Sequence, residues 1–199
     1  MEGIANERIQ WAEVWMQFKS GDPKAFSKIY EEFIDNLFAY GSKITTDREL
    51  LKDCIQDVFY NLYRYNIQLN HPEYLEFYLF RSLRNILIRK LGKSRKETFL
   101  AADGMVQFDL KFQAEQDHPD AEFDEIQLKT LLQILGTLDS EKRELLFLKF
   151  YTGLNYAEIG QLLGINPDTA KRQVYRLLNF LRMRYGKQLL QLLLVWMKG

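Results

Sequence analysis

Apolar residues recur at intervals of three and four along most of the chain, which is the spacing of amphipathic helices. The pattern predicts helices around 9–18, 23–38, 51–62, 73–91, 126–135 and 145–150, and it contains no convincing strand. Between Gly92 and about Phe123 the periodicity fails and acidic residues accumulate. We therefore expect an all-α protein with two small helical domains, at 5–92 and 125–187, joined by an acidic linker at 93–124.

The predicted core of the N-terminal domain is rich in aromatic side chains. The pair Asp22-Pro23 has the pattern of an N-cap followed by a first-turn proline. Cys54 lies on the apolar face of the 51–62 helix and is expected to be buried as a small hydrophobe, with a redox sensor as the alternative. The helix after Asp22 is expected to bury Phe26, Ile29, Tyr30, Phe33, Leu37 and Phe38. The residues expected to pack in the core of the 73–91 helix are Tyr74, Phe77, Tyr78 and Phe80.

The most specific pattern lies at residues 155–181. Asn155 and Glu158 have the spacing of a capping box, Gly164 is a turn residue, and Asn166-Pro167 begins a second helix. A short helix, a glycine turn and a basic second helix are typical of a DNA-binding helix-turn-helix. The apolar stripe of the second helix is Ala170, Val174, Leu177 and Leu181. Its polar arc, which predicts contacts with DNA, is Thr169, Lys171, Arg172, Tyr175 and Arg176.

The formal net charge is zero, but the charges are segregated along the chain. Residues 81–96 hold seven basic groups and no acidic ones, whereas residues 97–126 hold nine acidic groups and only Lys111 as a basic one. Residues 168–187 hold six basic groups and one acidic group. Two basic segments predict two polyanion-binding surfaces on two modules, with ordinary solvated faces as the alternative.

The composition argues against an enzyme. One cysteine excludes a disulfide framework, and His71 and His118 have no metal-ligand spacing around them, so we expect no metal and no cofactor. The sequence contains no glycine-rich phosphate loop and no Gly-x-Ser-x-Gly elbow, so no small-molecule substrate is expected. It also has no signal-peptide pattern and no apolar run of about 20 residues, which predicts a cytoplasmic protein.

Two separate segments resemble conserved regions of bacterial sigma factors. Residues 138–184, with Tyr-Ala-Glu-Ile-Gly at 156–160, are similar to the fourth region of that family. Residues 21–26, 53–59 and 78–85 resemble the second region. A chain with only these two regions and a short linker is similar to the extracytoplasmic-function (ECF) group of the sigma-70 family.

The resemblance implies a protein that binds core RNA polymerase and directs promoter recognition, DNA melting and transcription initiation. Asp53, Gln56 and Asp57 would dock on the clamp helices of the β′ subunit, with a plain solvated face as the alternative. The helix-turn-helix would contact the −35 element and the β flap. The −10 element would contact Tyr65, Asn66, Asn70, Arg81, Arg84, Asn85 and Arg89. A role in DNA melting is the alternative to core packing for Tyr74, Phe77, Tyr78 and Phe80.

The resemblance also implies further partners and placements. An anti-sigma factor would hold such a protein inactive, in some cases at the inner membrane. The acidic linker would thread into polymerase, or else remain a solvated tether. The chief alternative function is a degenerate sigma-like helix-turn-helix regulator that binds DNA without polymerase. A helical scaffold that binds only proteins would leave the basic arc at 168–187 unexplained.

The last segment, 188–199, is an apolar tail in which eight of the ten residues from Gln188 to Met197 are apolar. A contiguous apolar stretch of this kind marks a contact surface or an aggregation risk. Three outcomes are open for it: packing back on the C-terminal domain or its neighbour, self-association, or binding of an inhibitory partner.

Overall fold

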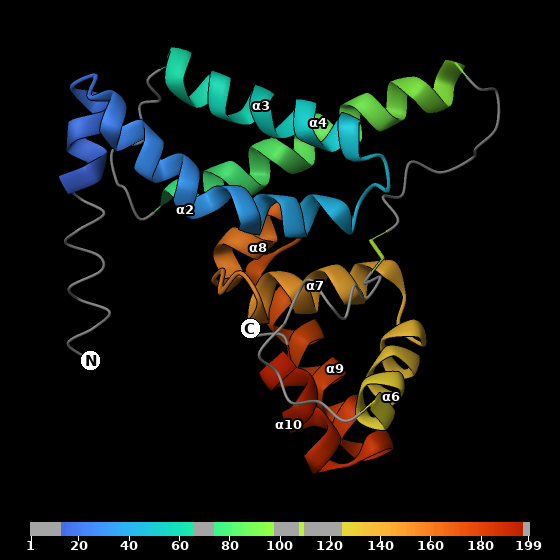
Figure 1. Ribbon diagram of the computed structural model, residues 1–199. Coiled ribbons are helices and arrows are strands. Elements are labelled where there is room, and N and C mark those ends of the chain that lie inside the picture. Colours follow the sequence, from blue (N-terminus) through green and yellow to red (C-terminus); the bar gives the residue numbers. More distant parts are fainter. Residues whose placement is uncertain (1–12, 66–73, 98–107, 110–124, 197–199) are drawn as a thin grey trace. The chain divides into compact units, whose positions relative to one another are not determined.

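The computed structural model describes residues 13–65, 74–97, 108–109 and 125–196, and the regular elements in these ranges are all helices (Figure 1). The chain divides into two compact units, residues 1–105 and 106–199. The predicted all-α fold class is therefore confirmed.

Three helices form the body of the N-terminal unit and pack against one another: α2 (Pro23–Ser42), α3 (Arg48–Tyr65) and α4 (Leu75–Glu97). Asp22 caps α2 by accepting a hydrogen bond from the backbone N–H of Lys24, as the Asp-Pro pair predicts. Cys54 is fully buried, and burial raises the pKa of its thiol, which confirms its role as a packed hydrophobe. The fully buried leucines of this core are Leu37, Leu51, Leu62, Leu79, Leu83 and Leu87.

The structure corrects several details of the predicted core. Tyr30 is 40% exposed and Tyr74 is 44% exposed, although both were expected to be buried. Phe80 of α4 is buried as predicted, and its ring centroid lies 5.3 Å from that of Tyr40 of α2, a buried residue that the sequence analysis did not single out. The helix α4 also continues to Glu97, past the predicted end near Leu91. A single glycine costs a helix only about 1 kcal/mol, so Gly92 does not end it.

The C-terminal unit is organised around one long helix, α9 (Pro167–Tyr185). Its predicted apolar stripe, Ala170, Val174, Leu177 and Leu181, is buried along its whole length. The helices α7 (Ser140–Phe150), α8 (Tyr156–Leu163) and α10 (Lys187–Trp196) pack against α9. The remaining helix, α6 (Glu125–Gly136), precedes α7 and buries Leu131, Ile134 and Leu135.

The connection between α8 and α9 has the geometry that the sequence predicts. The Asn155 side chain accepts hydrogen bonds from the N–H groups of Ala157 and Glu158, and the Glu158 carboxylate accepts one from the Asn155 N–H. Gly164 ends α8 with φ +72°, in the left-handed region that favours glycine. Asn166 then caps α9 by accepting from the Asp168 N–H.

Gly160 lies where the two helices of this motif approach most closely. A Cβ at this position would lie 2.7 Å from the Ile165 carbonyl oxygen and 3.2 Å from the Pro167 nitrogen, both backbone atoms. We therefore expect Gly160→Ala to lower the free energy of unfolding of the C-terminal unit by about 1–3 kcal/mol in a urea titration. The control is Gly136→Ala, where a Cβ meets nothing within 4 Å. Equal effects of the two substitutions would contradict this account.

The apolar tail forms α10 and packs against α9, which is the first of the three outcomes considered for it. Leu193 is 1% exposed, whereas Val195 on another side of the helix is 62% exposed. Gly186 makes the turn between the two helices with φ +87°. Within the described ranges, no helix is both long enough and apolar enough to cross a bilayer.

Candidate nucleic-acid interface

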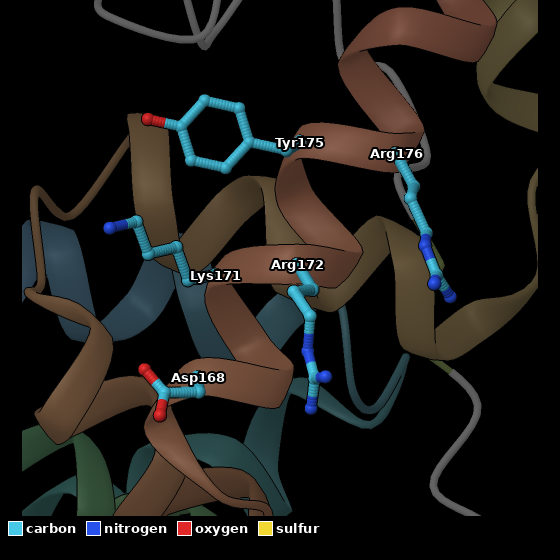
Figure 2. Close-up of a pocket in the computed structure, with 5 residues that line it drawn as sticks. All are labelled: Asp168, Lys171, Arg172, Tyr175 and Arg176. Carbon is cyan, nitrogen blue, oxygen red and sulfur yellow. The ribbon is translucent and has the colours of Figure 1, made fainter.

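The polar arc of α9 forms an exposed basic surface. Lys171, Arg172, Tyr175 and Arg176 are exposed, and Thr169 is half-buried. The four exposed residues and Asp168 line a shallow hollow on the helix. Figure 2 shows Lys171 and Tyr175 extending to one side of the helix and Arg172 and Arg176 extending to the other. The two side chains of each pair extend to the same side because they are four residues apart, which is about one turn of the helix.

The basic groups of this arc are available to a polyanion. Among the described residues, Lys171, Arg172 and Arg176 form no ion pair with a carboxylate, and Arg172 makes only a long hydrogen bond of 3.4 Å to the Thr169 hydroxyl. The burial of Ala170, Val174 and Leu177 on the opposite side keeps the arc turned toward solvent. Charged donors that are held on a helix and not neutralised by a carboxylate are suited to phosphates and base edges.

Two residues beside this arc were not singled out from the sequence. The Lys149 ammonium lies 4.9 Å from the ring centroid of Tyr156 and also donates to the Leu154 carbonyl at 3.1 Å. Burial, with a smaller effect of neighbouring Tyr175, raises the pKa of Tyr156. Tyr156 therefore lies near Tyr175 of the arc, and Lys149 of α7 lies over the Tyr156 ring. No local pattern marks Lys149, because its contacts depend on the tertiary fold.

The three polar residues of α3 that are predicted to dock on polymerase differ in their surroundings, because one of them is already paired. Asp53 and Gln56 are exposed, whereas Asp57 is half-buried. The Lys90 ammonium of α4 lies 2.8 Å from the Asp57 carboxylate, and this hydrogen bond raises the pKa of Lys90. Both side chains keep partial exposure, so the pair contributes less than about 1 kcal/mol. Asp57 thus links α3 to α4 as well as contributing to the face.

The basic segment of α4 separates into exposed and half-buried positions. Arg81, Asn85 and Arg89 are exposed and spaced by four, so they share one stripe. The Arg81 guanidinium lies 5.9 Å from the ring centroid of Phe77. Arg84, the fourth predicted contact on this helix, is half-buried. The structure therefore brings together three of the four predicted contacts on this helix.

The end of α3 carries an exposed aromatic and basic cluster. Tyr65 is 64% exposed, and the Arg64 guanidinium lies 5.9 Å from its ring centroid. Arg64 also donates to the Tyr60 hydroxyl at 2.7 Å. Exposed aromatic rings beside a cation are typical of sites that stack unpaired bases. Asn66 and Asn70, the other predicted residues of this connector, lie outside the described residues.

This chain is similar to known proteins in its helix-turn-helix and along most of its length. The family model described as "Sigma-70, region 4" matches residues 128–181. The ECF RNA polymerase sigma factor SigM of Bacillus subtilis is 24% identical over 161 residues, which cover 80% of this chain and 94% of that protein. The ECF RNA polymerase sigma factor SigW of the same organism is 24% identical over 182 residues, covering 88% and 94%.

A solved structure shares the fold. It is the sigma factor RpoE in complex with the anti-sigma factor NepR from Bartonella quintana, with a TM-score of 0.57 and 20% identity. The similarity covers 84% of this chain and 98% of RpoE. SigM and SigW align across most of the chain and not only across its helix-turn-helix, so the chain is similar to ECF sigma factors of the sigma-70 family over most of its length.

Proposed function

We propose that this chain binds core RNA polymerase, directs it to promoters and takes part in opening the DNA. The observation that carries the proposal is the pairing of two surfaces in one chain. One is the helix-turn-helix arc, whose basic groups form no ion pair among the described residues. The other is the exposed polar face of α3 around Asp53 and Gln56. DNA binding alone needs only the first surface, so the second favours a protein partner.

Each surface has a proposed role. The arc of α9 binds the −35 element, with Arg172 and Arg176 as base or phosphate contacts and Lys171 as a phosphate contact. The exposed stripe of α4, with Arg81, Asn85 and Arg89, binds the −10 element together with Arg84. The connector residues Tyr65, Asn66 and Asn70 hold an unstacked base of the opened strand. Asp53, Gln56 and Asp57 dock on the clamp helices of the β′ subunit, and the C-terminal unit contacts the β flap.

The partners in the cell follow from the same proposal. RpoE, which shares the fold, was solved with an anti-sigma factor bound. An anti-sigma factor is therefore a proposed partner of this chain, and it would hold the chain inactive in the bacterial cytoplasm or at the inner membrane. In this proposal, neither polymerase binding nor promoter binding by this chain requires a small-molecule substrate or a cofactor.

Co-elution with core RNA polymerase separates this function from its chief alternative. We expect the purified chain to elute with core enzyme on a size-exclusion column at low micromolar concentration, without DNA. A helix-turn-helix regulator that acts without polymerase would bind duplex DNA but elute alone. That second result would overturn the proposal.

A further inference from the structure

One carboxylate lies among the cations of the basic arc on α9. Asp168 is the second residue of this helix and the only acidic residue within 168–187, where six residues are basic. It is exposed, and it lines the hollow together with Lys171, Arg172, Tyr175 and Arg176. Figure 2 shows its carboxylate on the side of the helix that carries Lys171 and Tyr175, away from the Arg172 guanidinium. DNA that binds the arc therefore meets this negative charge as well.

The contacts within the fold leave the Asp168 carboxylate unused. The cap of α9 is Asn166, whose side chain accepts from the Asp168 backbone N–H at 2.8 Å. Within the described part of the chain, Asp168 forms no ion pair, although Arg172 is one turn further along the helix. The Arg172 guanidinium donates instead to the Thr169 hydroxyl at 3.4 Å. The remaining structural role of Asp168 is that of a first-turn acid, which interacts favourably with the helix dipole.

DNA offers a carboxylate few favourable contacts. The phosphates are negatively charged and repel it, and an ionised carboxylate can only accept hydrogen bonds. The donors in the major groove are the amino groups at N4 of cytosine and N6 of adenine. Adenine also presents its N7 acceptor beside the amino group, whereas cytosine presents the amino group without an adjacent acceptor on the same base. A carboxylate that faces the major groove therefore favours cytosine.

We propose that Asp168 selects a cytosine in the DNA that α9 binds. This inference rests on the proposed function, in which α9 binds the −35 element. The N-terminal residues of a recognition helix contact base edges in the major groove, and Asp168 holds the second position of α9. Its carboxylate accepts a hydrogen bond from the cytosine amino group. Lys171, three residues later on the same side of the helix, binds a phosphate and offsets the added negative charge.

The base preferences of two variants provide the first test. The wild-type, Asp168→Asn and Asp168→Ala chains are each bound to core RNA polymerase, and the sites retained from random duplex DNA are sequenced. We expect the wild-type chain to require cytosine at one position of the −35 element. The asparagine amide matches N6 and N7 of adenine, so Asp168→Asn should prefer adenine there, and Asp168→Ala should accept any base. Identical preferences in all three proteins would overturn the proposal.

Affinities for the selected duplex test the contact at the level of one amino group. Replacing the selected cytosine–guanine pair should weaken wild-type binding at least about fivefold and Asp168→Ala binding less than about twofold. N4-methylcytosine keeps the base pair but replaces the amino hydrogen that faces the major groove, so it should weaken only wild-type binding. On DNA of unrelated sequence, Asp168→Ala should bind up to about fivefold more tightly, because a charge that repels phosphates is gone. An equal loss on N4-methylation in both proteins would overturn the proposal.

A matched control separates base recognition from helix stability. Glu141 is an exposed first-turn acid of α7 and is not among the residues that line the hollow. Glu141→Gln should lower the unfolding midpoint by a similarly small amount as Asp168→Asn, but it should keep the wild-type base preferences. A matching change of base preference in Glu141→Gln would show that Asp168 acts only through helix stability, which overturns the proposal.

The same selection distinguishes failure of this inference from failure of the proposed function. If the wild-type site depends on Arg172 and Arg176 but contains no cytosine that is sensitive to Asp168, the inference fails and the proposed function stands. If the wild-type chain with core polymerase retains no common sequence, the proposed function fails, and with it the role of Asp168.

Discussion

Replacing Asp53 and Gln56 with arginine is expected to abolish co-elution with core RNA polymerase and to leave the fold intact. Both side chains are exposed on α3 and take no part in the core of the N-terminal unit. A docking partner that fits an acidic face is basic, so two introduced positive charges repel it. Disrupting a charged contact in an interface costs about 2–5 kcal/mol, which is at least about a 30-fold loss of affinity.

The choice of Asp53 and Gln56 avoids the third residue of the face. Asp57 pairs with Lys90, so Asp57→Arg would place two cations together and disturb the contact between α3 and α4. The matched control is Glu31→Arg, which reverses an exposed acid on α2. We expect the control to co-elute normally, and both proteins to keep the wild-type helical spectrum and unfolding midpoint. Normal co-elution of the Asp53→Arg, Gln56→Arg protein would contradict the assignment of this face.

Replacing Arg172 and Arg176 with alanine is expected to abolish sequence-specific binding to the −35 element. The two guanidinium groups extend to the same side of α9 and form no ion pair among the described residues (Figure 2). Each true base contact contributes about 1–3 kcal/mol, so the double variant should bind its selected site at least about 30-fold more weakly. The affinity of each protein for the selected duplex is measured by fluorescence anisotropy over a range of salt concentrations.

The salt dependence distinguishes the two kinds of contact. Loss of a phosphate contact makes the negative slope of log K against log salt shallower by about 0.9 and weakens binding to all DNA sequences alike. This is the expected result for Lys171→Ala. Loss of a base contact instead relaxes specificity at one position. The control is Arg182→Ala, also exposed on α9 but outside the arc and hydrogen-bonded to Asn179 at 2.8 Å. An unchanged affinity and specificity in Arg172→Ala, Arg176→Ala would contradict this assignment.

Features of the fold that depend on residues close in sequence could be predicted from the sequence alone. The caps at Asp22, Asn155 and Asn166 are each made by a side chain and a backbone N–H two or three residues away. The buried stripe from Ala170 to Leu181 follows directly from its three- and four-residue spacing. The helix-turn-helix was therefore predictable down to its individual polar residues.

Features that join distant residues could not be predicted in the same way. The pairing of Asp57 with Lys90 and of Asp109 with Arg143 depends on how helices pack, and the charge pattern alone fits many partners. Phe108 lies between Gln107 and Asp109 in a segment without a helical period, so the local sequence does not show whether its ring is buried. Tyr30 shows the converse error, because it has helical spacing but lies at the edge of the buried face.

The central claim is that this chain gives core RNA polymerase its promoter specificity, and reconstituted transcription tests it most directly. Core enzyme would be incubated with a selected promoter fragment, with and without the purified chain, and the transcripts mapped to their start site. We expect transcripts from one defined start only when the chain is present, and we expect their loss when either promoter element is scrambled. A chain that binds the fragment tightly while core enzyme starts no such transcript would contradict it.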